Sequence, residues 1–137
     1  MKIFIAGGAG MLGTSIAKEA KKKFDVINYD LDDTDDGVRF MDFRDFEIYN
    51  KNVNDYKPDY LFHIGAHTNL EYCEDNWKDA YLTNTESVEH AIKISNNLKI
   101  PLIYISTAGI FSGEKEFFSE IDLPEPLGNY AKSKYLG

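Results

Sequence analysis

Three glycines at intervals of three residues follow the first apolar segment of the chain, in the stretch IFIAGGAGMLG (residues 3–13). Between a strand and a helix, Gly7 allows a tight turn and Gly13 lets the helix lie close to a sheet. Gly10 lets the backbone approach a pyrophosphate without a Cβ in the way. The segment therefore predicts a strand, a phosphate-binding turn and a helix at the start of the chain.

The helix that follows this turn begins at Met11 and Leu12. The first N–H groups of a helix have no partner within it, and they lie at the positive end of the helix dipole. An anion is therefore stabilised at this end even in an acidic protein. We expect Met11 and Leu12 to bind the cofactor together with the three glycines.

The remaining sequence alternates strand-like apolar runs with helical ones. Strands are expected at 2–6, 25–30, 38–43, 57–66 and 100–107, and helices at 11–24, 44–54, 76–98 and 129–137. This alternation predicts an α/β fold of the Rossmann-like, doubly wound type, with a parallel sheet between two helical layers. The long helix is expected to pack on the sheet through Trp77, Tyr81, Val88, Ala91 and Ile92.

Length and charge limit the domain organisation and the classes of partner. No repeat, low-complexity tract or linker divides the 137 residues, so one NAD(P)-binding domain at 1–137 is expected. The net charge of -8 disfavours binding to nucleic acid or to an anionic membrane. Cys73 is the single cysteine, and neither a signal peptide nor a long apolar run is present, so a cytoplasmic location is expected.

Asp30 ends the second predicted strand, 23 residues after Gly7. An acidic side chain at this place can accept hydrogen bonds from the ribose hydroxyls of NAD. The 2′-phosphate of NADP would meet Asp30, Asp32 and Asp33 there, so NAD is the expected cofactor and NADP is disfavoured. The alternative for Asp30 is a solvated loop carboxylate.

No metal site is expected. His63, His67 and Cys73 are potential zinc ligands, but His63 falls in a predicted core strand and no fourth ligand has a suitable spacing. The acidic run at 30–36 begins like a calcium loop, yet it lacks the closing glutamate and the preceding helix.

Five segments occur in an order that resembles a known family. They are GGAGMLG (7–13), Asp42–Phe43, HIGAHT (63–68), STAGIFSG (106–113) and NYAKSK (129–134). Together they resemble the motif series of the extended short-chain dehydrogenases/reductases, the NAD-dependent epimerase/dehydratase group. The last third of the chain is most similar to the dTDP-4-dehydrorhamnose reductase branch. The resemblance covers essentially the whole chain and implies a nucleotide-sugar substrate.

The resemblance implies roles for individual residues. Asp42 would accept a hydrogen bond from the adenine amino group, with Phe43 beside the ring. Gly65 and Ala66 would lie against the cofactor ribose. Thr107 would hydrogen-bond the reacting oxygen of the substrate.

Tyr130 and Lys134 would form the Tyr-x-x-x-Lys pair of the family, and Asn84 would help to place a water behind the lysine. Four residues along a helix bring two side chains onto one face, so the ammonium lies near the phenol. A nearby cation favours the phenolate, and Tyr130 can then exchange a proton with a carbonyl or alcohol oxygen while hydride moves at carbon. Taken alone, the segment is also compatible with an exposed amphipathic turn.

Two positions depart from related enzymes. Ala108 and Gly109 stand where sugar-nucleotide dehydratases have an Asp-Glu pair, so dehydration is not expected. The reductase branch usually has Asp and Tyr at these positions, whereas epimerases tolerate Ala. We expect NAD-dependent oxidoreduction of a nucleotide-activated sugar, by a 4-keto-sugar reductase or an epimerase. The alternative class is a non-catalytic, nucleotide-binding regulatory or stand-alone module, which the presence of Tyr130 and Lys134 disfavours.

The chain stops three residues after Lys134, where the family continues into a C-terminal substrate domain. We therefore expect an N-terminal fragment, truncated after the Tyr-x-x-x-Lys helix and inactive alone; a natural short module is the alternative. A sheet edge and a helix face that the substrate domain would cover favour self-association, for example as a homodimer.

Overall fold

The computed structural model describes residues 1–32 and 37–137, and within these ranges the strands form one parallel five-stranded sheet. The strands are β1 (Lys2–Ala6), β2 (Asp25–Asp30), β3 (Val38–Phe40), β4 (Tyr60–His63) and β5 (Leu102–Tyr104), in the spatial order β3-β2-β1-β4-β5. The order changes direction beside β1, as in a doubly wound fold. The predicted Rossmann-like class is confirmed.

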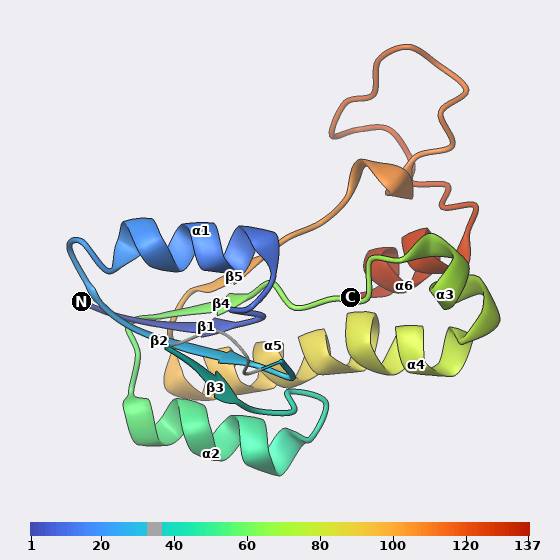
Figure 1. Cartoon of the computed structure of the whole chain (residues 1–137). Coiled ribbons are helices and arrows are strands. Elements are labelled where there is room, and N and C mark those ends of the chain that lie inside the picture. Colours follow the sequence, from blue (N-terminus) through green and yellow to red (C-terminus); the bar gives the residue numbers. More distant parts are fainter. Residues whose placement is uncertain (33–36) are drawn as a thin grey trace.

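Helices cover both faces of this sheet (Figure 1). The first helix, α1 (Met11–Ala20), lies on one face, and α2 (Phe46–Tyr56) and α5 (Ser87–Leu98) lie on the other. Three further helices, α3 (Leu70–Asp75), α4 (Trp77–Tyr81) and α6 (Asn129–Leu136), gather beyond the carboxyl ends of the strands. In the part of the chain that is described, no helix has the length and apolarity needed to cross a membrane.

The central strand β1 supplies both halves of the core. Phe4 packs with the buried side chains beneath α2 and α5, whereas Ile3 and Ile5 pack with Ala17 beneath α1. All three β1 side chains are at most 4% exposed. A strand that is covered on both faces needs apolar residues at successive positions, and KIFIA meets that need.

The long predicted helix is interrupted by a wider turn. A π-helical turn, η1 (Leu82–Glu86), joins α4 to α5. Val88 and Ala91 are buried as expected, but the predictions for Trp77 and Ile92 are wrong, since these side chains are 36% and 40% exposed. The buried positions of α5 follow Val88, Ala91 and Ile94, three residues apart, and Ile92 lies beside that row.

Several predicted elements are longer than the observed ones, and α3 is absent from the prediction. The expected strand at 57–66 shortens to β4 because the amides of Ile64 and Gly65 both donate to the carbonyl of Ala6, which turns the chain over the end of β1. The strands expected at 38–43 and 100–107 shorten to three residues each. The helix expected at 11–24 ends at Ala20.

Residues 111–127 form a loop that extends away from the sheet (Figure 1). Inside it the rings of Phe111 and Phe118 stack with their centroids 4.7 Å apart, and Lys115 pairs with Asp122. Ile121 and Leu123 point outward and are 92% and 88% exposed. The loop therefore presents apolar side chains that nothing in the described chain covers.

Candidate functional site

A cavity of about 620 Å³ opens at the carboxyl edge of the sheet, at the ends of β1, β2 and β4. It lies where the strand order changes direction, which is the usual place for a ligand in an open α/β sheet. Most of the predicted cofactor residues line it, together with the predicted catalytic pair: Gly7, Gly10, Met11, Leu12, Gly13, Asp30, Phe43, Gly65, Ala66, Tyr130 and Lys134. Asp42 and Thr107 do not.

The three glycines of the first turn serve different purposes. Gly7 has a φ of +97°, and a Cβ there would lie 2.2 Å from the backbone nitrogen of Gly65. A Cβ on Gly13 would lie 2.1 Å from the carbonyl oxygen of Gly7. At Gly10 the nearest atom to a Cβ would be 3.7 Å away, so that position has room for a side chain. Gly7 and Gly13 are required by the fold, and Gly10 leaves space in the cavity.

Asp30 ties the end of β2 to the glycine turn. Its Oδ2 accepts a hydrogen bond from the amide of Ala9 at 2.9 Å, and its Oδ1 accepts one from the amide of Asp32 at 3.3 Å. The half-buried carboxylate thus stands in the cavity wall with a fixed orientation. Asp33, and with it most of the run considered for calcium, lies outside the described residues.

The ring of Phe43 leaves no space for a side chain at Gly65. A Cβ on Gly65 would lie 2.5 Å from the Phe43 ring, which is 2% exposed and meets the His63 ring edge-on at 5.3 Å between centroids. Glycine at 65 therefore admits the aromatic ring to the cavity wall. Ala66, the next residue, also lines the cavity.

Asp42 is engaged by its neighbour Arg44. Nε and Nη2 of Arg44 donate to the two carboxylate oxygens of Asp42, each at 2.8 Å, and Nη1 reaches Asp79 at 3.2 Å. The Arg44 hydrogen bond holds the pKa of Asp42 below its usual value. The structure thus places Asp42 in an ion-paired cluster outside the cavity lining.

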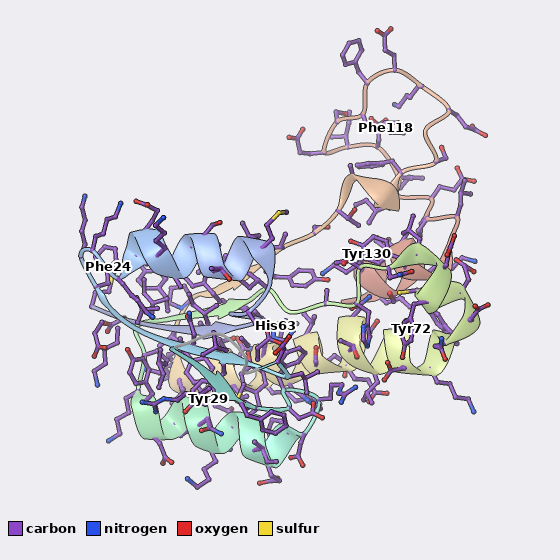
Figure 2. The ribbon with its side chains drawn as sticks, in the orientation of Figure 1. Phe24, Tyr29, His63, Tyr72, Phe118 and Tyr130 are labelled. Carbon is purple, nitrogen blue, oxygen red and sulfur yellow. The ribbon has the colours of Figure 1, made fainter. Side chains whose placement is uncertain are left out.

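Tyr130 and Lys134 both line the cavity from α6. Figure 2 labels Tyr130 on this helix. Lys134 is 5% exposed, and burial lowers the pKa of its ammonium to about 8. Its Nζ lies 4.1 Å from the centroid of the Tyr104 ring. The spacing of four residues therefore brings a phenol and a buried amine to the same cavity, as the sequence predicts.

Thr107 lies just beyond β5, next to this cavity. Its Oγ1 accepts a hydrogen bond from the amide of Gly109 at 3.1 Å and so begins a short 3₁₀ turn, η2 (Ala108–Ile110). The two preceding residues, Ile105 and Ser106, line the cavity. Thr107 therefore follows two cavity-lining residues directly and is fixed by a hydrogen bond within its own turn.

Asn84 lies in the π-helical turn and joins two parts of the site. Its Oδ1 accepts from the amide of His67 at 2.8 Å, and its Nδ2 donates to the carbonyl of His67 at 2.9 Å and to Oγ of Ser133 at 3.0 Å. The loop after β4 is thereby fixed to the helix that carries Lys134. The resemblance implied a place for Asn84 near Lys134. In the structure Asn84 contacts Ser133, the residue before that lysine.

Sequence reasoning missed the hydroxyl of Thr83. This side chain lines the cavity and is 2% exposed, and its Oγ1 has no hydrogen-bond partner among the residues described. Buried hydroxyls are nearly always hydrogen-bonded, so a bound molecule is the natural partner. The only sequence signal was its position beside Asn84.

His63 is buried in a defined hydrogen-bond chain, between the sheet and α5 (Figure 2). The Ser87 hydroxyl donates to the carbonyl of Thr83 at 2.5 Å, so it accepts from Nε2–H of His63 at 3.0 Å. Nδ1 of His63 then accepts from the hydroxyl of Tyr49 at 3.1 Å. Burial lowers the pKa of His63 to about 3, which keeps the ring neutral. His63 thus acts as a core residue behind the cavity.

The other two residues considered for zinc lie apart from His63. The ring of His67 contacts Asp79 at 2.8 Å, and the buried thiol of Cys73 lies 3.8 Å from the carbonyl of His67. Among the described residues, no group of three or more His, Cys, Asp or Glu side chains is arranged to hold a metal ion.

Comparisons with known proteins agree with this geometry. The family model described as the RmlD substrate binding domain matches residues 1–137. The dTDP-4-dehydrorhamnose reductase of Escherichia coli (strain K12) is 28% identical over 138 residues, which cover 100% of this chain and 45% of the relative. The methionine adenosyltransferase 2 subunit beta of Xenopus tropicalis is 26% identical, over 99% of this chain and 41% of the relative.

A solved structure shows the same fold with a ligand. The dTDP-4-dehydrorhamnose reductase of Bacillus anthracis str. Ames, in complex with NADP, superposes with a TM-score of 0.87 and 26% identity, over 98% of this chain and 46% of that one. The chain spans about half the length of the curated relatives it matches.

Proposed function

The chain belongs to the RmlD substrate binding domain family, and from this we propose that it supplies the dinucleotide-binding half of an enzyme that oxidises or reduces a nucleotide-activated sugar. The observation that carries the proposal is one cavity lined both by the glycine turn and by Tyr130 and Lys134. One wall suits a pyrophosphate and the other suits proton transfer. A 4-keto-sugar reductase and an epimerase are both compatible with these walls.

The residues around the cavity fit a nicotinamide dinucleotide. Such a ligand would fill the space at Gly10. It would also accept hydrogen bonds from the first amides of α1 and pair with the unpartnered hydroxyl of Thr83. The glycine turn, Met11 and Leu12 would hold the pyrophosphate, and Asp30 would hold a ribose. Phe43, Gly65 and Ala66 would form the wall beneath the ligand.

The chemistry at the other wall is divided between the bound nucleotide and this chain. When bound, the nicotinamide supplies or accepts hydride. Tyr130 gives a proton to, or takes one from, the substrate oxygen, and the ammonium of Lys134 favours the phenolate that remains. Thr107 would orient that oxygen from its place beside the cavity.

The preference for NAD over NADP is part of the proposal. The Asp30 carboxylate, oriented by the amide of Ala9, puts a negative charge where a 2′-phosphate would have to lie. The solved Bacillus anthracis relative was obtained with NADP, so the comparison with NADP belongs in the first titration.

Sugar recognition is assigned to residues outside 1–137. The relatives are about twice as long as this chain, and the residues that line the cavity are the ones proposed here for the dinucleotide and for proton transfer. We therefore expect residues 1–137 to bind the nucleotide and to need the remaining length of such a protein for turnover.

The competing function is a non-catalytic regulatory subunit. A relative that is named as a subunit, the methionine adenosyltransferase 2 subunit beta, supports a subunit role. A subunit without catalysis has no need for a tyrosine and a buried lysine in one cavity, and this chain has both.

Calorimetric titration with NAD and NADP tests the proposal. We expect saturable binding of NAD, lost in Gly10→Val and kept in Tyr130→Phe, because the first change fills the ligand space and the second leaves it open. Absence of nucleotide binding by a folded chain overturns the proposal. In a full-length protein carrying these residues, hydride transfer to a nucleotide-linked 4-keto sugar should be lost in Tyr130→Phe while nucleotide binding is retained.

A further inference from the structure

Tyr104, the last residue of β5, contacts Lys134 in two ways. The ammonium nitrogen of Lys134 lies 4.1 Å from the centroid of the Tyr104 ring, within the range of a cation–π contact. The hydroxyl of Tyr104 donates a hydrogen bond to the backbone carbonyl of Lys134 at 3.1 Å. One side chain of the sheet therefore holds both the side chain and the backbone of this helical residue.

The ammonium is buried without a carboxylate partner in the described part of the chain. Lys134 is 5% exposed, and none of the ion pairs among the described residues involves it. Tyr104 from β5 and His63 from β4 interact with Lys134, and Tyr130 from α6 lines the same cavity; of these, His63 is neutral. The negative face of the Tyr104 ring is thus the group that compensates for lost hydration.

A neutral ring serves this site better than a carboxylate would. A carboxylate beside Lys134 would stabilise the ammonium, but its negative charge would also disfavour a phenolate at Tyr130. An aromatic face attracts the cation and carries no net charge. Burial raises the pKa of Tyr104 itself to about 12, so its ring stays un-ionised at neutral pH.

We propose that Tyr104 is a positioning residue of this site, whose ring holds the Lys134 ammonium charged in the cavity wall and whose hydroxyl fixes the turn of α6 that carries it. The role of Lys134 beside Tyr130 rests on the proposed function. The contact between Tyr104 and Lys134 does not, because it exists without any ligand.

Measuring the pKa of Lys134 by ¹⁵N NMR in the 137-residue chain tests the inference, with Lys134→Met to assign the signal. In Tyr104→Leu the pKa should fall by about one unit, the equivalent of one buried cation–π contact. Tyr104→Phe keeps the ring and should shift the pKa by less than about 0.3 units. An unchanged pKa in a folded Tyr104→Leu variant overturns the inference.

A fluorinated series provides a second arm that preserves shape. Phenylalanines with an increasing number of ring fluorines at position 104 weaken the negative face while nearly keeping the volume. The pKa of Lys134 should fall stepwise along the series, whereas a purely structural role for the ring predicts a constant value. This readout needs no nucleotide, so a chain that follows the series but does not bind NAD refutes the proposed function and still supports the contact.

Discussion

Gly7 and Gly65 approach so closely that a Cβ on Gly7 would lie 2.2 Å from the backbone nitrogen of Gly65. The amide of Gly65 donates to the carbonyl of Ala6, so the ends of β1 and β4 are joined at the edge where the cavity opens. The space at Gly10, three residues further along the chain, is not needed for this contact. Packing and ligand binding thus make separate demands on neighbouring glycines.

Substitutions at Gly7 and Gly10 should therefore have different effects. Gly7→Ala forces backbone atoms apart and should lower the free energy of unfolding by at least about 2 kcal/mol. Gly10→Val should change it by less than about 1 kcal/mol and should abolish nucleotide binding. Thermal unfolding followed by circular dichroism, with calorimetry on the folded variants, measures both. Equal destabilisation by the two changes would contradict the division.

Asp30→Asn removes the charge of the carboxylate and keeps an oxygen that can accept from Ala9. The ratio of NADP to NAD affinity should rise about tenfold, since a charge-assisted hydrogen bond to ribose is lost and repulsion of a 2′-phosphate is relieved. Asp30→Ala also loses the bond from Ala9 and should cost about 1 kcal/mol of stability. A nucleotide preference that is unchanged in both variants would show that Asp30 serves the turn alone.

Lys134 makes the stability of the chain depend on pH in the alkaline range. Its pKa falls from 10.5 in the unfolded chain to about 8 when buried, so the folded state binds fewer protons between these values and stability rises with pH across them. Below pH 8, Lys134→Met should be more stable than the parent by up to about 3 kcal/mol. The difference should vanish near pH 10.5.

Lys132 lies on the same helix and is exposed, which makes Lys132→Met the matched control. Melting temperatures of both variants and the parent between pH 7 and 10.5 check the prediction. A Lys132→Met variant with the same gain and the same pH dependence would rule out burial of Lys134 as the cause.

His63 changes stability in the same direction with pH as Lys134 does, but in the acid range. The unfolded ring has a pKa of 6.5 and the buried ring about 3, so the unfolded chain binds the extra proton and stability is lost as the pH falls through this window. The His63→Gln variant has no such group to protonate, so its free energy of unfolding should fall less than that of the parent as the pH is lowered. Denaturant unfolding of the parent and the variant measures the difference. If both chains lose the same stability between pH 6.5 and 3, His63 is not neutral in the fold.

The hydroxyl of Ser87 is the second test of the buried chain. Ser87→Ala leaves Nε2–H of His63 and the carbonyl of Thr83 without their partner, which should cost about 1–3 kcal/mol. Ser95→Ala provides a comparison on the same helix, because that hydroxyl only returns to the carbonyl of Ile92. Urea unfolding measures the free energy of unfolding of both variants. Ser87→Ala should cost more than Ser95→Ala, and an equal or smaller cost would contradict the prediction.

The loop at 111–127 should promote self-association. Ile121 and Leu123 are nearly fully exposed in the described chain, and apolar groups in water associate. Changing both to Ser should lower the fraction of dimer or higher species in sedimentation velocity. Thr14→Ser, an exposed position on α1, serves as the control.

The sequence predicted the fold class and named most of the residues that line the cavity, because both depend on local patterns. A glycine turn between a strand and a helix shows where β1 ends and α1 begins. The four-residue spacing of Tyr130 and Lys134 places both side chains on one face of α6. The positions of Asp42 and Thr83 could not be predicted in this way. The carboxylate of Asp42 is taken up by Arg44 through a contact that depends on side-chain conformation, and the isolation of the Thr83 hydroxyl depends on everything packed around it.

The helix 77–98 shows the same limit. Its apolar spacing predicted one regular helix, whereas five residues, Leu82–Glu86, form a π-helical turn. Three successive side chains of that turn, Thr83, Asn84 and Thr85, are buried. Successive side chains of a regular helix point about 100° apart, so three in a row do not all face one neighbouring element, and periodicity alone does not report which polar groups hold them buried.

The π-helical turn also constrains how this chain can change its length. Removing one residue between Leu82 and Glu86 would restore a regular α-helix and leave the helix after it nearly in phase, but it would take away or displace one of the three buried side chains Thr83, Asn84 and Thr85. The buried row Val88, Ala91 and Ile94 would be kept, whereas Asn84 would lose its hydrogen bonds to His67 or Ser133. A one-residue deletion here is therefore expected to be far more damaging than one in the exposed loop at 111–127, so gaps among functional homologues should collect in the loop and avoid the helix.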